Sequence, residues 1–201
     1  MKIIGITGGV GSGKSRILSY MEERFQAVVC QADHVAWDLQ KPGEVCYKEI
    51  VSYFGTGILN KDETIDRKVL GQIVFSNEEE LLKLNAITHP AVKDAIRKQI
   101  ESEVKRGIEL FVIEAALLIE EHYDEICDEL WYIYTDRQVR RERLKTSRQY
   151  TDEKIDAIMA SQLPEEIFRE RCQKIINNSG DFEETCIQLE EAIKDLGENE
   201  R

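Results

Sequence analysis

Short apolar runs alternate along this chain with stretches whose apolar residues recur every three or four positions. The apolar runs are rich in β-branched residues and short, which is typical of buried strands. Between the first two runs, Ile17, Leu18, Met21 and Phe25 have the spacing of a helix. Five runs predict strands: KIIGIT (2–7), AVVC (27–30), LFVIE (110–114), LWYIYT (130–135) and KIIN (174–177). The alternation predicts an α/β fold with a parallel five-stranded sheet flanked by helices.

The alternation is interrupted between residues 41 and 106. This stretch has helical patterns and no convincing parallel strand, and it is longer than one crossover connection requires. We interpret it as a helical insertion, 41–106, that forms a substrate-binding part of a single domain over 1–201. The core of that domain is then 1–40 and 107–201. The end of the chain, GENER, is expected to be frayed.

Composition and charge exclude several classes of protein. The 201 residues are 42% hydrophobic and 33% charged, as in soluble globular proteins. A net charge of -12 argues against broad nucleic-acid or anionic-membrane binding. No signal peptide or membrane-length apolar run is evident, and five spaced cysteines without a Cys-x-x-Cys pair favour reduced thiols. We expect a cytoplasmic protein without nucleic-acid or membrane partners, a monomer or a weak homo-oligomer.

The segment GGVGSGKS matches the phosphate-binding pattern G-x-x-x-x-G-K-[ST] between a strand and a helix. Glycines let successive backbone N–H groups turn toward an anion, and the helix directs its positive end at the same point. Lys14 adds a charge for the β- and γ-phosphates, and the Ser15 hydroxyl can bind Mg²⁺. The predicted binders of a nucleoside triphosphate are Gly8, Gly9, Gly11, Ser12, Gly13, Lys14 and Ser15. A switch GTPase is disfavoured, because no Asp has a Gly three residues later.

Two carboxylates follow predicted strands. Asp33 comes just after the second strand, at the carboxyl edge of a parallel sheet, where it is a candidate base for an acceptor hydroxyl. Asp is also a preferred N-cap, and the next helix is expected to start near His34. Glu114 ends the third strand, where it would lie beside Mg²⁺ or merely cap or turn the chain.

Arginines gather in a protein that is otherwise acidic. Five of them stand close together: Arg137, Arg140, Arg141, Arg143 and Arg148. Guanidinium groups suit phosphate contacts, and on a helix Arg140 and Arg143 share a face, as do Arg141 and Arg148. The alternative is a solvated helix paired with Asp136 and Glu142. A break at SRQYTDEK predicts a helical hairpin over about 137–163, which we interpret as a lid.

In order and spacing, these and further motifs resemble the dephospho-CoA kinase family over nearly the full chain. The matching segments are GITGGVGSGKS (5–15), QADHVAWDLQKPG (31–43), YFGTGIL (53–59), IDRKVLGQIVFSN (65–77), LNAITHP (84–90), LLIE (117–120), RERL with Arg148, ASQ (160–162) and IINNSGDFEE (175–184). The resemblance implies a P-loop kinase fold of three layers. It also implies ATP- and Mg²⁺-dependent phosphorylation of the ribose 3′-hydroxyl of dephospho-CoA, the last step of CoA synthesis.

The resemblance implies roles for particular residues. Catalysis would involve Asp33 as the base, with Lys14, Arg143 and Arg148 near the phosphates. The nucleotide would also contact Arg16, Asn178 and Gly180. The acceptor would contact Thr7, Asp33, His89, Leu117 and Glu120. From the residues alone, His89 could equally be a core or helix-cap histidine ahead of Pro90.

Several positions depart from the family pattern. The family usually has an acid where Gln31, Gln173 and Asn177 stand, a Thr at Arg16 and a Pro at Ala116. These changes leave the loop lysine, the loop serine and the candidate base in place, so an active enzyme is expected. Two alternatives stay open: a kinase for another nucleoside or nucleotide acceptor, and a nucleotide-binding protein with little turnover.

Overall fold

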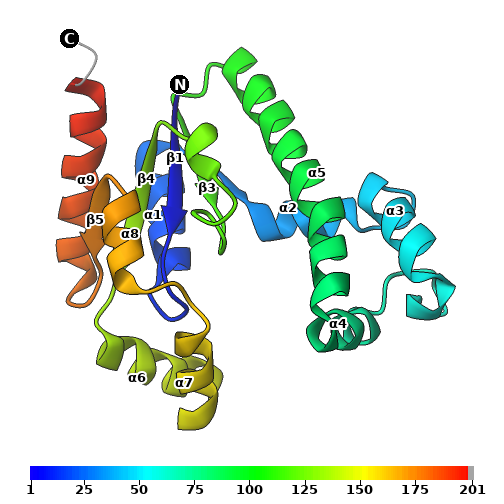
Figure 1. Cartoon of the computed structure of the whole chain (residues 1–201). Helices are drawn as coiled ribbons and strands as arrows, with labels where there is room; N and C mark the ends of the chain where they lie inside the picture. Colours follow the sequence, from blue (N-terminus) through cyan, green and yellow to red (C-terminus); the bar gives the residue numbers. More distant parts are fainter. Residues whose placement is uncertain (199–201) are drawn as a thin grey trace. The chain divides into compact units, whose positions relative to one another are not determined.

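The computed structural model describes residues 1–198 of the chain. Its five strands are β1 (Lys2–Thr7), β2 (Val28–Gln31), β3 (Leu110–Glu114), β4 (Glu129–Tyr134) and β5 (Lys174–Asn177). They form one sheet in the order β2-β3-β1-β4-β5, in which β1 pairs in parallel with β3 and β4, and β4 with β5 (Figure 1). The predicted strands are therefore confirmed, each to within one residue at either end. The predicted frayed tail lies mostly outside the described residues.

Helices follow the strands along the chain. They are α1 (Lys14–Phe25), α2 (Ala32–Leu39), α3 (Val45–Phe54), α4 (Arg67–Ser76), α5 (Glu78–Lys105), α6 (Arg137–Arg148), α7 (Asp152–Ala160), α8 (Glu165–Arg171) and α9 (Phe182–Glu198), with short 3-10 turns η1 (Thr56–Ile58) and η2 (Tyr123–Glu125). Side-chain caps mark several starts. Asp66 and Asp136 each accept from two backbone N–H groups of the helices that they precede, and Thr151 caps α7.

The chain folds into two compact units. One comprises Met1–Val29 and the chain from Val104 onward, and the other is Cys30–Glu103. The first unit therefore holds most of the sheet with α1 and α6 to α9, and the second holds α2 to α5. The predicted insertion, 41–106, overlaps the second unit, which additionally takes in α2.

The core of the first unit lies between the sheet and two helices. Ile4 and Ile6 of β1 and Trp131 of β4 are fully buried, and Ile17 of α1 and Leu189 of α9 pack in the same cluster. The helical spacing read in α1 therefore corresponds to a buried stripe. This packing fixes the start of α1, and with it the phosphate-binding loop, against the end of β1.

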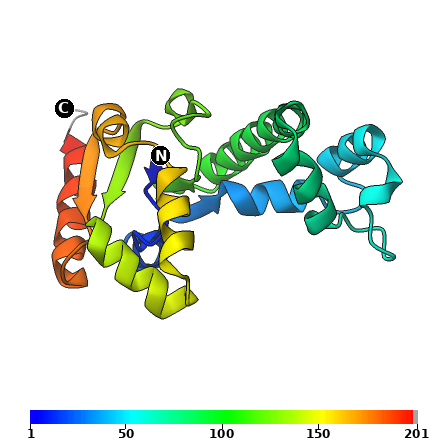
Figure 2. The same ribbon diagram turned by 60° about the horizontal axis from the view of Figure 1, so that its bottom comes forward.

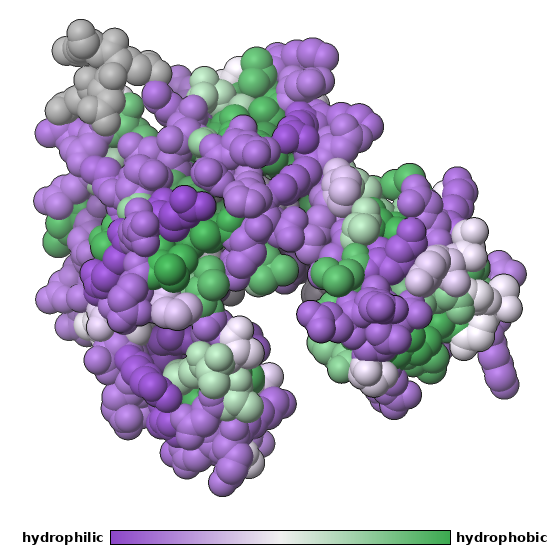
Figure 3. Space-filling model, viewed as in Figure 1, coloured by the Kyte–Doolittle hydropathy of each residue, from purple (hydrophilic) through white to green (hydrophobic). Residues whose placement is uncertain are grey.

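The second unit has its own small core. Cys46 and Ile50 of α3, Ile58 of η1, and Leu70 and Val74 of α4 form it together with part of α5. Apolar side chains also reach its surface, which Figure 3 draws as green areas among the purple ones. The most exposed are Phe75 and Leu82. All five cysteines of the chain are free thiols, as expected.

Across residues 1–198, each helix is either too short or too polar to cross a bilayer.

Candidate functional site

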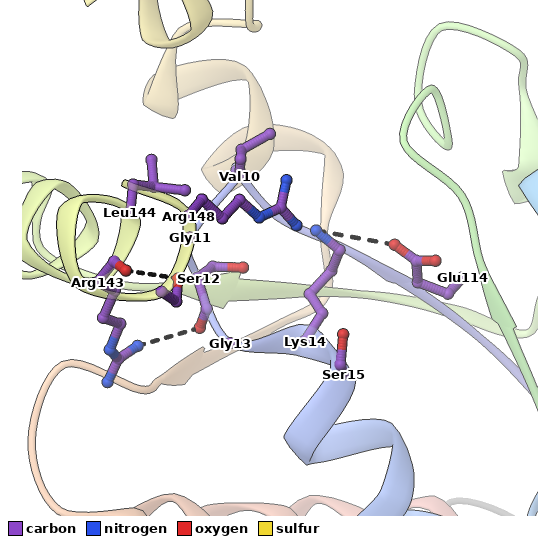
Figure 4. A pocket seen from close by; sticks show the side chains of 12 residues that line it. Val10, Gly11, Ser12, Gly13, Lys14, Ser15, Glu114, Arg143, Leu144 and Arg148 are labelled. Carbon is purple, nitrogen blue, oxygen red and sulfur yellow. Dashed lines mark hydrogen bonds and ion pairs between the residues drawn. The ribbon is translucent and has the colours of Figure 1, made fainter. Parts of the chain in front are cut away.

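A pocket of about 420 Å³ lies where the loop after β1 leads into α1 (Figure 4). Its volume falls in the range of small-molecule sites. Loop residues 9–15, Glu114 at the end of β3, and Leu144 and Ser147 of α6 line it together with two arginines, Arg143 and Arg148. All of these residues belong to the first compact unit. The loop, the acid and part of the arginine set predicted from sequence thus meet in one concavity.

Gly13 is the residue that joins the loop to α1. It is the N-cap of the helix with a φ of 86°, in the left-handed region that side chains other than glycine rarely adopt. A Cβ atom there would also collide with the side-chain amide nitrogen of Asn178. Glycine is therefore needed both for the turn and for the close approach of a neighbouring segment.

Lys14 reaches across the pocket toward an acid. Its Nζ donates to the carbonyl oxygen of Gly8 at 2.7 Å and lies 3.7 Å from Oε1 of Glu114. The side chains of Lys14 and Glu114 are only 17% and 14% exposed. The ammonium group is thus held in a defined position at the positive end of α1, where a phosphate would meet it.

The same pocket offers oxygen donors of the kind that Mg²⁺ prefers. The Ser15 hydroxyl and the Glu114 carboxylate both line it. No group of three or more His, Cys, Asp or Glu side chains that could hold a metal occurs within residues 1–198. A magnesium ion here would therefore depend on these two residues, on water and on the phosphates of the ligand, which is how Mg²⁺ is commonly bound at nucleotide sites.

The carbonyl oxygen of Ser12 is a meeting point for three chain segments. It accepts hydrogen bonds from Oγ1 of Thr135 at 3.0 Å and Nδ2 of Asn178 at 2.7 Å. Arg143 donates to the same oxygen through Nη1 at 3.4 Å. Thr185 in turn donates to Oδ1 of Asn178 at 3.0 Å, and both side chains are buried. The loop is therefore held from β4, α6 and the segment after β5.

This network gives Asn178 a different surrounding from the one expected. The resemblance assigned it to the nucleotide, whereas its side-chain amide is engaged with Ser12 and Thr185 inside the protein. Contact with a nucleotide remains a prediction for this residue. Sequence reasoning missed Thr135 and Thr185, since a threonine ending a strand or inside a helix carries no local signal of such a bond.

Asn178→Ala should lower the free energy of unfolding by about 1–3 kcal/mol, because it removes a donor from the Ser12 carbonyl and leaves the buried Thr185 hydroxyl with one acceptor fewer. Urea denaturation measures the change. Asn177→Ala is the matched control. The side chain of this exposed neighbour accepts a local bond from the Ser179 backbone N–H, and the backbone carbonyl that accepts from Thr185 and Gln188 is kept in the variant. A loss as large for Asn177 as for Asn178 would contradict a specific role for the buried network.

Two arginines of α6 anchor that helix to the loop. Nε of Arg140 donates to the carbonyl oxygen of Val10 at 3.0 Å, and Nη2 of Arg143 donates to that of Asn178 at 2.9 Å. Burial lowers the pKa of both guanidinium groups, and for Arg143 the nearby charge of Arg16 adds to this effect. Both remain charged at neutral pH. The prediction that Arg140 and Arg143 share a face is confirmed.

Other basic residues of α6 tie it to α7, which lies beside it in Figures 1 and 2. Arg141 pairs with Asp152 and Asp156, and Lys145 bonds Asp152 at 2.8 Å. Hydrogen bonds lower the pKa of Asp152, and the one from Lys145 has a larger effect than the one from Arg141. The helical hairpin is confirmed.

Asp136 and Glu142, the alternative partners of these arginines, have other contacts in the described structure. Asp136 instead caps α6, and Glu142 accepts from Gln138. Arg148, at the end of α6, is left lining the pocket. Figure 4 draws its guanidinium on the same side of the loop as the ammonium group of Lys14. Arg141 does not line the pocket with Arg148, because its side chain is paired with two acids of α7.

Asp33 lies in the second compact unit. It belongs to the first turn of α2 and is exposed. The helix begins at Ala32 with Gln31 as its N-cap, so the expected start near His34 and the capping role for Asp33 were wrong. His89, also in the second unit, precedes Pro90 within α5 and is partly buried.

The remaining predicted residues of the first unit lie outside the pocket lining. Thr7 is buried at the end of β1, and the guanidinium carbon of Arg16 lies 3.8 Å from the centre of the Phe182 ring. Leu117 and Glu120 are exposed on the segment after β3, and Gly180 is exposed after β5. Binding roles for these residues remain predictions.

One of the replaced acids has a structural role. Oε1 of Gln173 accepts from the backbone N–H of Leu130 at 2.7 Å, and the backbone N–H of Gln173 donates to the Leu130 carbonyl at 2.9 Å. The side chain therefore extends the pairing of β4 and β5 and is not part of the pocket lining.

Known proteins resemble this chain over most of its length. A family model described as dephospho-CoA kinase matches residues 2–184. A dephospho-CoA kinase of Halalkalibacterium halodurans is 40% identical over 194 residues, 96% of this chain and 95% of the relative. One of Carboxydothermus hydrogenoformans is 37% identical over 189 residues, 94% of this chain and 91% of the relative.

Solved structures agree on the fold. A Thermus thermophilus protein has a TM-score of 0.80 at 27% identity, covering 97% of both chains. A dephospho-CoA kinase from Campylobacter jejuni reaches 0.72 at 24% identity over the full length of both chains. A shikimate kinase from Acinetobacter baumannii reaches 0.54 at 12% identity, covering 98% of this chain and 94% of its own. The sheet, its helices and the loop thus form the P-loop kinase fold.

Proposed function

This chain belongs to the dephospho-CoA kinase family, and from that premise we propose that it transfers the γ-phosphoryl group of ATP to the ribose 3′-hydroxyl of dephospho-CoA. The observation that carries the proposal is the family match over residues 2–184 together with a phosphate-binding loop that lines a pocket. The products are CoA and ADP, and the reaction completes CoA synthesis.

The first compact unit would bind and polarise ATP. The loop and the positive end of α1 would receive the β- and γ-phosphates, and Lys14 would neutralise the charge that spreads over the transferred group. Arg148 lines the same pocket and is the second cation for that charge. Arg143 lines it too, but it donates hydrogen bonds to the backbone carbonyls of Ser12 and Asn178, so it would act mainly by holding the loop.

Magnesium fits the oxygen donors of this pocket. Ser15 and Glu114 would hold it, the latter directly or through water. When bound, the ion would screen the negative charges of the phosphates. Glu114 has a second task, since it also pairs with Lys14 at 3.7 Å.

Asp33 would be the base. In the transfer step its carboxylate takes the proton of the 3′-hydroxyl, the ribose oxygen bonds to the γ-phosphorus, and the bond from that phosphorus to the bridging oxygen breaks, which releases ADP. The exposure of Asp33 and its place directly after β2 support this role. For the acceptor contacts, Thr7, His89, Leu117 and Glu120 are the residues that the family resemblance favours.

The hairpin of α6 and α7 would serve as the lid. It carries Arg148, and the acid–base pairs between its two helices make it a unit that can move together. Exclusion of water by such a lid would suppress hydrolysis of ATP while the acceptor is absent or misplaced.

The activity test measures ADP release with ATP and Mg²⁺, with and without dephospho-CoA, and with adenosine or AMP as other acceptors. ADP formation that depends on dephospho-CoA and stops when EDTA removes the metal is the expected result. ADP release stimulated by another acceptor instead would support kinase activity and contradict dephospho-CoA as the acceptor. ATP binding without turnover on any acceptor would mean a nucleotide-binding protein in a kinase fold.

A further inference from the structure

A second pocket, of about 460 Å³, lies wholly within the second compact unit. It is formed by the end of α2, the turn that follows, and the segment that leads into α4. Its lining residues are Trp37, Asp38, Gln40, Lys41, Pro42, Thr64, Ile65 and Arg67. Its volume lies within the range of ligand sites, and none of its lining residues has a role in the proposed reaction.

An arginine stacked on an exposed tryptophan dominates this pocket. The guanidinium carbon of Arg67 lies 4.8 Å from the centre of the Trp37 ring, and Trp37 is 47% exposed. Both side chains line the pocket, so the ring and the guanidinium group are accessible to a ligand there. Attraction between the cation and the ring face favours keeping Arg67 beside Trp37 before any ligand arrives.

The remaining charges of the pocket favour an anion. Lys41 pairs with Asp38 at 2.6 Å, and both side chains are largely exposed. Because that pair cancels, the charge of Arg67 stands as the excess in the lining. A cationic pocket is notable in a protein of net charge -12. A guanidinium fork suits the paired oxygens of a phosphate group.

The pocket shares a helix with the proposed base. Asp33 and Trp37 are four residues apart on α2, so they lie on the same face, about 6 Å apart along the axis. A ligand whose hydroxyl reaches Asp33 would therefore present its next group to Trp37 and Arg67. In dephospho-CoA the ribose that carries the 3′-hydroxyl also carries the 5′-diphosphate, an anion only a few bonds away.

We infer that the pocket around Trp37 and Arg67 binds the 5′-diphosphate of dephospho-CoA. This rests on the proposed function and adds to it a specificity determinant: Arg67 binds the diphosphate, Trp37 holds Arg67 in orientation, and the acceptor ribose is thereby registered against Asp33. An acceptor that lacks the diphosphate, such as adenosine, gains nothing from the pocket.

A third pocket supplies a matched control. Tyr53 is 49% exposed, and Nζ of Lys83 lies 5.2 Å from the centre of its ring. The pair lines a shallower concavity between α3 and α5 in the same unit. It repeats the aromatic–cation arrangement, but with a lysine, which lacks the fork, and away from α2. Lys83→Gln therefore removes a comparable charge from a comparable surface.

The experiment compares Arg67→Gln, Trp37→Leu and Lys83→Gln. Arg67→Gln is expected to raise both KM and Kd for dephospho-CoA about 10- to 100-fold, the loss of a charge-assisted hydrogen bond. The values of kcat and of KM for ATP should stay within about twofold, because the contact is equal in the ground and transition states. Trp37→Leu should raise KM and Kd for dephospho-CoA by a smaller factor than Arg67→Gln does. Lys83→Gln should leave both constants unchanged.

Titration calorimetry of dephospho-CoA without ATP provides a readout that does not depend on turnover. If wild type and Arg67→Gln bind dephospho-CoA equally well, the proposed diphosphate site is contradicted. The proposed kinase activity is not affected by that result. An equal loss in Lys83→Gln would overturn it too, since general charge would then explain the effect. Absence of phosphorylation by wild type, with tight binding that Arg67→Gln abolishes, would refute the activity and keep the site. Thermal melts identify any variant that fails to fold.

Discussion

Lys14→Met is expected to lower kcat by about a thousandfold, the size of loss seen when one preorganised charge at a developing anion is removed. Methionine keeps most of the length of the side chain but cannot donate to the Gly8 carbonyl or neutralise the transferred phosphoryl group. The effect should fall mainly on kcat, because the charge that Lys14 meets is largest in the transition state. Steady-state kinetics with saturating dephospho-CoA and Mg²⁺ measure it.

Removal of Lys14 also leaves Glu114 without its partner at 3.7 Å in a largely buried position. The double variant Lys14→Met with Glu114→Gln is therefore measured beside the single variant. It removes the unpaired charge of Glu114, so any difference in kcat between the two variants reports the effect of that charge. Lys105→Met, at the exposed end of α5, is the control and should keep wild-type rates. A loss of less than tenfold in kcat for Lys14→Met would show that the loop and α1 alone carry the stabilisation.

Asp33→Asn should lower kcat by about 10²- to 10⁴-fold and leave the KM for ATP unchanged. The amide has the shape of the carboxylate but accepts no proton at neutral pH. Asp33 is exposed in the first turn of α2, so the substitution is expected to leave the fold intact. Dephospho-CoA-dependent ADP release and ATP binding are measured on the same preparations.

Asp94→Asn serves as the comparison for Asp33. It is an exposed acid of the same compact unit, paired with Lys98 on α5, and its change should leave turnover unaltered. If Asp33→Asn keeps more than a tenth of the wild-type kcat, the base is another group or water. In that case the KM for dephospho-CoA decides whether Asp33 contacts the acceptor at all.

The sheet and the phosphate loop could be predicted because their signals are local. Each strand is an apolar run bounded by turn residues, and the loop combines a fixed spacing with a strand before it and a helix after it. Asp33 and Glu114 could be selected as candidates for a related reason, because Glu114 ends β3 and Asp33 comes two residues after β2. The start of α2 was misjudged by two residues, since Gln31 is not a usual N-cap and gives no warning.

The supports of the site could not be read in this way, because they depend on partners distant in sequence. Thr135 and Asn178 are 123 and 166 residues from Ser12, whose carbonyl they share. The division of the arginines among loop, α7 and pocket likewise depends on how two helices pack. The local acids Asp136 and Glu142 looked like suitable partners, but a cap and a glutamine contact take them instead.

The position of β1 has a consequence for how the protein is made. This strand is synthesised before both of its neighbours in the sheet, because β3 and β4 begin more than a hundred residues later. At usual translation speeds the first strand and its loop wait roughly 5 to 20 seconds for their neighbours. The hydrogen bond from Asn178 to the Ser12 carbonyl can form only later still, because Asn178 is 166 residues further along the chain. A chain that has not yet reached Asn178 therefore carries the whole phosphate motif without the scaffold that shapes it, and we expect ATP binding only after that residue has been made.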